Sequence, residues 1–196
     1  MAATQARTRA ASLPPEERRR TIVDAAIPLV VEHGEMVATR HVADAAGIAE
    51  GTLFRVFPDK ESLLAAVIER VLDPEPLEQA LAAIDAERPL TEVVTAAVQA
   101  SQRRGEDVWR VVSRIGKRSE DQPRRPMPES PALTRLLEAH RDELTVAPTV
   151  AARNLRALTL AMSHPLLVER PASPKEIARM FLHGVAKDLS AKGRSC

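Results

Sequence analysis

Apolar residues recur every three or four positions along most of the chain, which is the spacing of amphipathic α-helices. The stripes predict helices at about 14–33, 39–46, 49–57, 59–72, 77–84, 93–104, 133–140, 148–166 and 174–189, with a further segment at 108–115. No run alternates apolar and polar residues between hairpin turns, so we expect an all-α fold. Pro28 falls inside the first predicted helix and should kink or split it.

Residues 39–60 predict two short helices joined by a glycine turn, as in a helix-turn-helix DNA-binding motif. Thr39 suits the N-cap of the first helix, and Gly47 suits a left-handed residue just past its end. Asp59 suits the N-cap of the helix that follows the motif. Leu53 and Phe57, four residues apart, predict the buried face of the second helix. The residues left to point outward are Glu50, Thr52 and Arg55. From this stretch alone, an ordinary helical hairpin is the alternative.

With its flanks included, the segment 20–71 resembles the DNA-binding domain of the TetR family of bacterial transcriptional regulators. The matching residues are Ile22, Ala25, Ala26, Gly34, Thr39, Val42, Ala43, Ala46, Gly47, Ile48, Gly51, Thr52, Leu53, Phe54, Phe57, Asp59, Lys60, Glu61, Leu63 and Leu64. A weaker match at 164–167, 173–178 and 181–185 resembles the last two helices of such regulators, which pair two subunits in the family.

The resemblance implies which side chains contact DNA. Those at the DNA backbone would be Thr39, Arg40, Phe54 and Lys60, and those facing base edges would be Glu50, Gly51, Thr52 and Arg55. A homodimer would then bind a palindromic operator in double-stranded DNA.

Besides Pro28, three residues depart from the family pattern. Ala49 stands where Ser or Thr usually caps the recognition helix, and Phe54 replaces a Tyr whose hydroxyl commonly reaches a phosphate. Glu50 places a carboxylate at the leading end of that helix. Carboxylates repel phosphates, but they accept a hydrogen bond from the N4 amine of cytosine. We therefore take Glu50 as a clue to sequence preference.

The net charge of +1 over 196 residues does not by itself indicate a nucleic-acid-binding protein. Residues 1–60 carry eight Arg and Lys and eight Asp and Glu, a net charge of zero. Positive charge is instead local: five arginines lie within residues 7–20, and Arg40, Arg55 and Lys60 lie on the motif. Local placement matters most, because phosphate contacts act within a Debye length of about 8 Å.

We find no motif of an enzyme. The five histidines form no spaced metal-binding set with Cys, Asp or Glu, and there is no phosphate-binding glycine loop or nucleophile elbow. We therefore expect neither a metal nor a cofactor. The one cysteine, Cys196, and the absence of a signal peptide or long apolar span indicate a cytoplasmic protein without a membrane anchor.

The predicted organisation is a flexible arm at 1–12, a three-helix DNA-binding domain at 13–60, and a larger helical ligand-binding and dimerisation domain at 61–196. A proline-rich loop at 119–131 interrupts the ligand-binding and dimerisation domain. An apolar or amphipathic effector would bind near Trp109, Leu137, Leu158 and Met162, chosen as large apolar residues on middle helices; the alternative is plain core. The predicted dimer seam comprises Leu155, Leu158, Met162, Leu166, Ile177, Phe181 and Val185. Its alternative is a core within one chain.

Together these features predict a ligand-responsive transcriptional regulator of the TetR type, and the resemblance to the family implies that it is a repressor. The alternative is a helical dimeric ligand-binding protein whose helix-turn-helix has degenerated, for which Ala49, Glu50 and Phe54 are the motivation. A helical enzyme is a third and weaker alternative.

Overall fold

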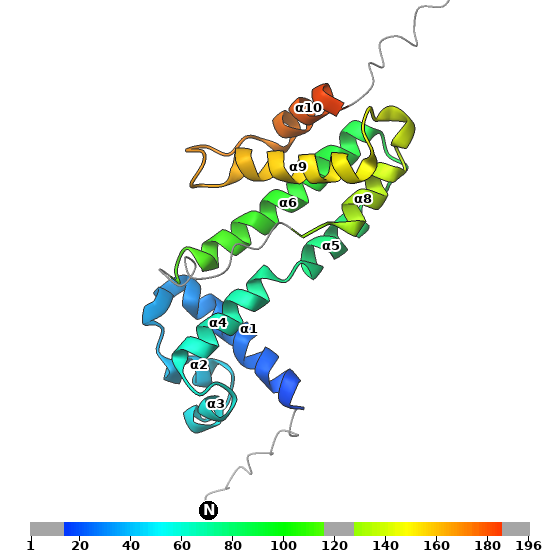
Figure 1. Ribbon diagram of the computed structural model, residues 1–196. Helices are drawn as coiled ribbons and strands as arrows, with labels where there is room; N and C mark the ends of the chain where they lie inside the picture. Colours follow the sequence, from blue (N-terminus) through cyan, green and yellow to red (C-terminus); the bar gives the residue numbers. More distant parts are fainter. Residues whose placement is uncertain (1–13, 116–127, 186–196) are drawn as a thin grey trace, which may run out of the picture. The chain divides into compact units, whose positions relative to one another are not determined.

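The computed structural model describes residues 14–115 and 128–185, and these residues form helices and no strand (Figure 1). The expected all-α fold is confirmed for this part of the chain. The predicted arm at 1–12, most of the predicted loop at 119–131, and the end of the last predicted helix beyond residue 185 lie outside the described residues.

The described residues divide into two compact units. The first contains residues up to 70 together with 111–115, and the second contains 71–110 and 128–185. The first unit therefore extends beyond the predicted boundary at residue 60, because it includes most of α4 (Lys60–Leu72) as well as the three helices before it.

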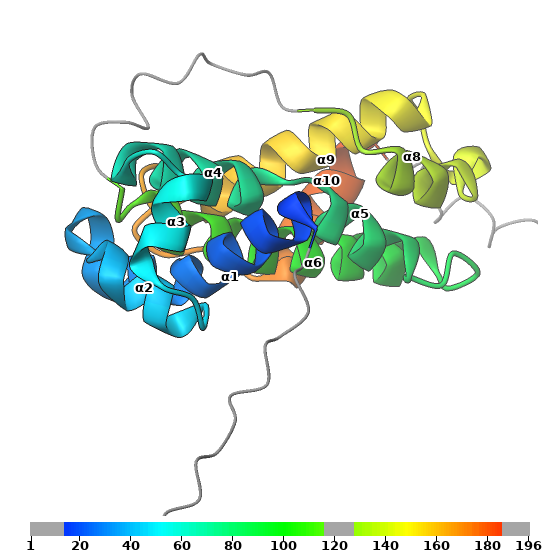
Figure 2. The ribbon, with the colours of Figure 1, turned by 90° about the horizontal axis from the view of Figure 1, so that it is seen from below.

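In the first unit, α1 (Pro15–His33) contacts the 3-10 turn η1 (Gly34–Met36) and α2 (Thr39–Ala45), and α2 contacts α3 (Glu50–Val56) (Figures 1 and 2). Helix α1 continues past Pro28 without the predicted split. Pro28 is exposed, so water can solvate the carbonyl that loses its partner. The buried apolar residues of these helices are Ile22, Val23, Ala26, Val30, Val42, Ala43, Leu53, Leu63, Leu64, Ala66, Val67 and Ile68.

The second unit contains α5 (Glu75–Ala82), most of α6 (Leu90–Val112), α8 (Pro131–Glu138), the 3-10 turn η2 (Arg141–Glu143), α9 (Pro148–Ser163) and α10 (Pro174–Val185). Helix α8 packs against both α5 and α9, and α10 packs on α9. The sequence predicted a helix ending near residue 104 and a separate segment at 108–115. Instead, α6 runs unbroken through the exposed Gly105, since a single helical glycine costs only about 1 kcal/mol.

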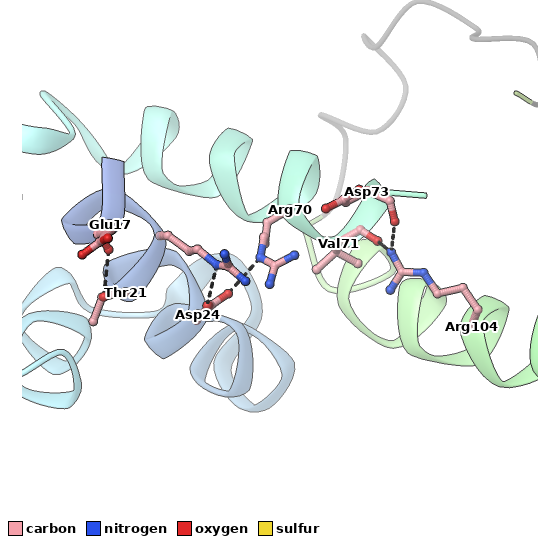
Figure 3. Close-up of polar contacts among 8 residues, drawn as sticks. Glu17, Thr21, Asp24, Arg70, Val71, Asp73 and Arg104 are labelled. Carbon is pink, nitrogen blue, oxygen red and sulfur yellow. Dashed lines mark hydrogen bonds and ion pairs between the residues drawn. The ribbon is translucent and has the colours of Figure 1, made fainter. Parts of the chain in front are cut away.

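Two arginines make hydrogen bonds at the C-terminal end of α4, one within each unit (Figure 3). In the first unit, Arg70 of α4 donates to the carboxylate of Asp24 on α1 at 3.0 Å. In the second, Arg104 of α6 donates to the backbone carbonyls of Val71 and Asp73, the latter at 2.7 Å. The last carbonyls of a helix have no partner within it, and a cationic donor also suits the negative end of the helix dipole. Arg104 therefore caps α4.

Gly34 ends α1 in a conformation that only glycine adopts readily, with φ of 58° and ψ of −141°. A Cβ at this position would lie 2.8 Å from the backbone carbonyl oxygen of Arg114, which belongs to the same unit. Gly47 also has a positive φ, of 67°, but a Cβ there would meet no atom within 4 Å.

We expect Gly34→Ala to lower the free energy of unfolding by more than Gly47→Ala does. The Gly47 variant should lose about 1–2 kcal/mol from backbone strain alone. The Gly34 variant adds a collision with a backbone oxygen, which cannot move aside as a flexible side chain can. Urea unfolding midpoints of the two variants would test the difference; equal losses would contradict the close approach to Arg114.

Candidate DNA-binding site

The turn between α2 and α3 is built on Gly47. Its N–H donates to the carbonyl of Asp44 at 3.1 Å, and the N–H of Ile48 donates to that of Ala43 at 3.0 Å. The positive φ at Gly47 lets the chain reverse within these few residues. This arrangement matches the predicted helix, glycine turn and second helix.

Helix α3 buries one face and exposes the opposite one. Leu53 and Phe57, which follows the helix, are completely buried. Gly51 and Arg55 each lie two residues from Leu53, and therefore on the opposite face, where both are exposed. A helix that presents its free face in this way has the form that enters a major groove.

The other predicted contacts on α3 lie beside this free face. Phe54 is 43% exposed although it is aromatic, and Thr52 is partly exposed. The guanidinium of Arg19 lies 4.4 Å from the ring centre of Phe57, so a cation–π contact covers the buried end of α3.

Neither helix of the motif begins with a side-chain cap. Ala38 is the N-cap of α2 and Ala49 that of α3. The prediction that Thr39 caps α2 is wrong, because Thr39 is already the first helical residue. Its hydroxyl donates instead to Oε1 of Glu50, the first residue of α3, at 2.7 Å. This bond joins the starts of the two helices.

Two cations lie at the beginnings of helices α2 and α4. Arg40 is exposed in the first turn of α2, and Lys60 is the partly exposed first residue of α4. The start of α4 is fixed by Asp59 as predicted: its carboxylate accepts from the N–H of Ser62 at 2.6 Å, and the Ser62 hydroxyl donates to the Asp59 carbonyl. These two bonds from Ser62 to Asp59 fix the backbone that carries Lys60.

The four residues predicted to line an effector site lie in the second unit. Leu137 is completely buried in its core, and Leu158 and Met162 pack against that core while staying partly exposed. Trp109 contacts the ring of His164 edge to face, with ring centres 4.7 Å apart. Leu137 is therefore a core residue, whereas Trp109, Leu158 and Met162 keep accessible surface.

The predicted dimer seam needs correction. Leu155, Ile177, Phe181 and Val185 are buried inside the chain's own core, where α10 packs on α9. Only Leu166 of the predicted set is strongly exposed, at 74%. The exposed large apolar residues of α9, α10 and their connection are Leu160, Leu166, Leu167 and Met180.

No group of His, Cys, Asp and Glu within residues 14–115 and 128–185 could hold a metal ion. In the same part of the chain, no helix combines the length and hydrophobicity needed to cross a bilayer.

Sequence comparison places the helix-turn-helix among known proteins. Residues 22–67 match the model of bacterial regulatory proteins of the tetR family. Over 56 residues the chain is 45% identical to the HTH-type transcriptional repressor KstR of Rhodococcus jostii, covering 28% of this chain and 26% of that protein. KstR of Mycobacterium tuberculosis is 46% identical over 55 residues, which cover 28% and 25% of the two chains. The match thus spans about a quarter of these curated relatives.

Solved structures resemble the chain over a longer stretch. A structure that describes how bacterial hormones control antibiotic production has a TM-score of 0.55 at 25% identity, covering 87% of this chain and 98% of that one. A TetR family transcriptional regulator from Pseudomonas syringae has a TM-score of 0.53 at 20% identity, covering 88% and 99%. Residues 22–67 therefore belong to the tetR family of bacterial regulatory proteins, and the described residues as a whole share the fold of a solved TetR family regulator.

Proposed function

We propose that this protein is a cytoplasmic transcriptional repressor that binds a palindromic operator as a homodimer and releases it when an effector binds. The observation that carries the proposal is the exposed face of α3, where Gly51 and Arg55 lie opposite the buried Leu53 and Phe57. Repression is taken from the repressors that match the motif over about a quarter of their length.

Base recognition is assigned to the free face of α3. The guanidinium of Arg55 can donate two hydrogen bonds to O6 and N7 of a guanine, and the methyl group of Thr52 can contact that of a thymine. Arg40 and Lys60, at the starts of α2 and α4, would neutralise phosphates on either side. Phe54 would pack against the sugar–phosphate backbone, since it lacks a hydroxyl to donate.

The exposed apolar surface of α9 and α10 supports a homodimer. Leu160 of α9 is 45% exposed and Met180 of α10 is 54% exposed, while the opposite faces of both helices fill the chain's own core. Two such faces can bury each other across a two-fold axis. The twofold symmetry would in turn require an operator with two inverted half-sites.

The second unit would bind the effector. An apolar or amphipathic molecule could contact Trp109, Leu158 and Met162, which keep accessible surface beside the core. Effector binding could lower the affinity for the operator by no more than the factor by which the effector binds the DNA-free form more tightly than the DNA-bound form. Because Trp109 is the single tryptophan, its fluorescence would report an effector bound nearby.

The decisive experiment is selection of duplexes from a fragmented genomic library, followed by binding of the recovered sequence at several salt concentrations. A single palindrome with a steep salt dependence would support the repressor. If folded, dimeric protein enriched no duplex, the alternative of a dimeric ligand-binding protein with a degenerate helix-turn-helix would be favoured, in line with the uncapped Ala49.

Arg55→Ala and Lys60→Ala should weaken operator binding in different ways. Loss of Arg55 should relax the preference for one base pair in each half-site, at a cost of about 1–3 kcal/mol there. Loss of Lys60 should weaken binding to all duplexes alike and reduce the salt slope by about one unit. Titrations against the operator and its single-base variants would measure both; a uniform loss for Arg55→Ala would contradict its assigned role.

Gly51→Ala should make the protein more stable but a weaker DNA-binding protein. A Cβ at Gly51 would meet nothing within 4 Å, so alanine should stabilise α3 by about 0.5–1 kcal/mol. The added methyl group lies on the face assigned to the bases, and we expect operator affinity to fall on the order of tenfold. Gly105→Ala is the matched control: it is also exposed, helical and uncrowded, and should gain stability while keeping its affinity.

Met180→Glu should shift the dimer towards monomer, because it places a charge within the proposed apolar interface. Met36→Glu is the control, since Met36 is 85% exposed and belongs to the first unit and not to α9 or α10. Sedimentation at several protein concentrations would compare the two. A Met180→Glu protein that dimerises as tightly as the control would place the interface elsewhere.

A further inference from the structure

We propose that Thr39 positions Glu50, and that the Glu50 carboxylate recognises a cytosine in each half-site of the operator. This inference deepens the proposed function and rests on it. It assigns the Thr39 hydroxyl to base specificity instead of to the DNA backbone. It also explains why this chain tolerates a negative charge at the leading end of α3.

The contact is made between the first residues of two helices. Thr39 begins α2 and Glu50 begins α3, and the hydroxyl oxygen lies 2.7 Å from Oε1 of the carboxylate. A glutamate side chain has three rotatable bonds, so an exposed one samples many positions in water. The bond from Thr39 restricts Glu50 before DNA arrives, and such preorganisation reduces the entropy lost on binding.

The single proton of a hydroxyl excludes two simultaneous donor roles. In the observed arrangement the Thr39 hydroxyl donates that proton to Glu50. Its oxygen retains only lone pairs, which cannot bond to a phosphate oxygen, because that oxygen is also an acceptor. Thr39 therefore cannot hold Glu50 and donate to the DNA backbone at the same time.

The carboxylate keeps the capacity to contact a base. An ionised carboxylate offers about four acceptor positions, and the bond from Thr39 occupies one of them. Guanine and thymine present acceptors in the major groove, which a carboxylate repels. Adenine presents the N7 acceptor beside its amine, whereas cytosine presents only the N4 amine as a polar group. Cytosine is thus the base that fits a negatively charged acceptor best.

The test compares Thr39→Val, Thr39→Ser and Glu50→Gln with the wild-type protein on the selected operator and its single-base variants. Thr39→Val and Glu50→Gln should both reduce the preference for cytosine at the same position, on the order of tenfold. Thr39→Ser retains the hydroxyl and should keep the preference. Thr39→Val combined with Glu50→Gln should lose little more than Glu50→Gln alone, since both changes act through one contact.

A second readout separates positioning from a phosphate contact. Binding to a nonspecific duplex should be the same for Thr39→Val and the wild-type protein if Thr39 acts only through Glu50. An equal loss of affinity for every duplex would overturn the proposal and return Thr39 to the backbone. Retention of the wild-type base preference by Glu50→Gln would overturn it as well.

The outcome for the wild-type protein separates this inference from the proposed function. If the wild-type protein selected no duplex, both would fail together. If it selected a palindrome whose base preferences were indifferent to changes at Thr39 and Glu50, only the present inference would fail. Thr39→Ser shows whether a loss in Thr39→Val comes from the missing hydroxyl or from altered folding of α2.

Discussion

The complete burial of Leu53 and Phe57 is the constraint on which the DNA-binding unit depends. These two side chains fix the rotation of α3 about its own axis, because no other orientation hides both from water. Everything proposed for the opposite face follows from that rotation. Arg19 of α1 packs over Phe57 and covers the end of this core. Helix α1 therefore helps to fix the orientation of α3, although no sequence motif links the two helices.

Much of this unit could be predicted from the sequence, because its determinants are local. Glycine at the turn, apolar residues four apart and an Asp–Ser cap each act within a few residues, and Gly47, Leu53 and Asp59 all take their expected roles. The contact between Thr39 and Glu50 could not be predicted in this way. It depends on the angle between two helices, and either side chain alone has an ordinary local explanation.

The second unit shows the limit of periodicity more sharply. The stripe containing Ile177 and Phe181 is predicted to lie in a dimer seam, with a core within one chain as the alternative, and the structure buries it in the chain's own core. An apolar stripe predicts that a helix face is buried, but it does not indicate whether the residues that bury it belong to the same chain or to a second copy. Gly105 shows a related limit. The low helix propensity of glycine favours the end of a helix at this position, but α6 continues through it because the turns on either side are helical.

The first unit is also discontinuous in sequence, because residues 111–115 belong to it while the forty residues before them belong to the second unit. Val111 and Ile115 are buried, and the backbone of Arg114 approaches Gly34 closely. A fragment that stops at residue 70 would therefore lack part of its own core. In this chain the DNA-binding unit cannot be exchanged between proteins as a continuous cassette; a chimaera that keeps it intact must also carry the end of α6.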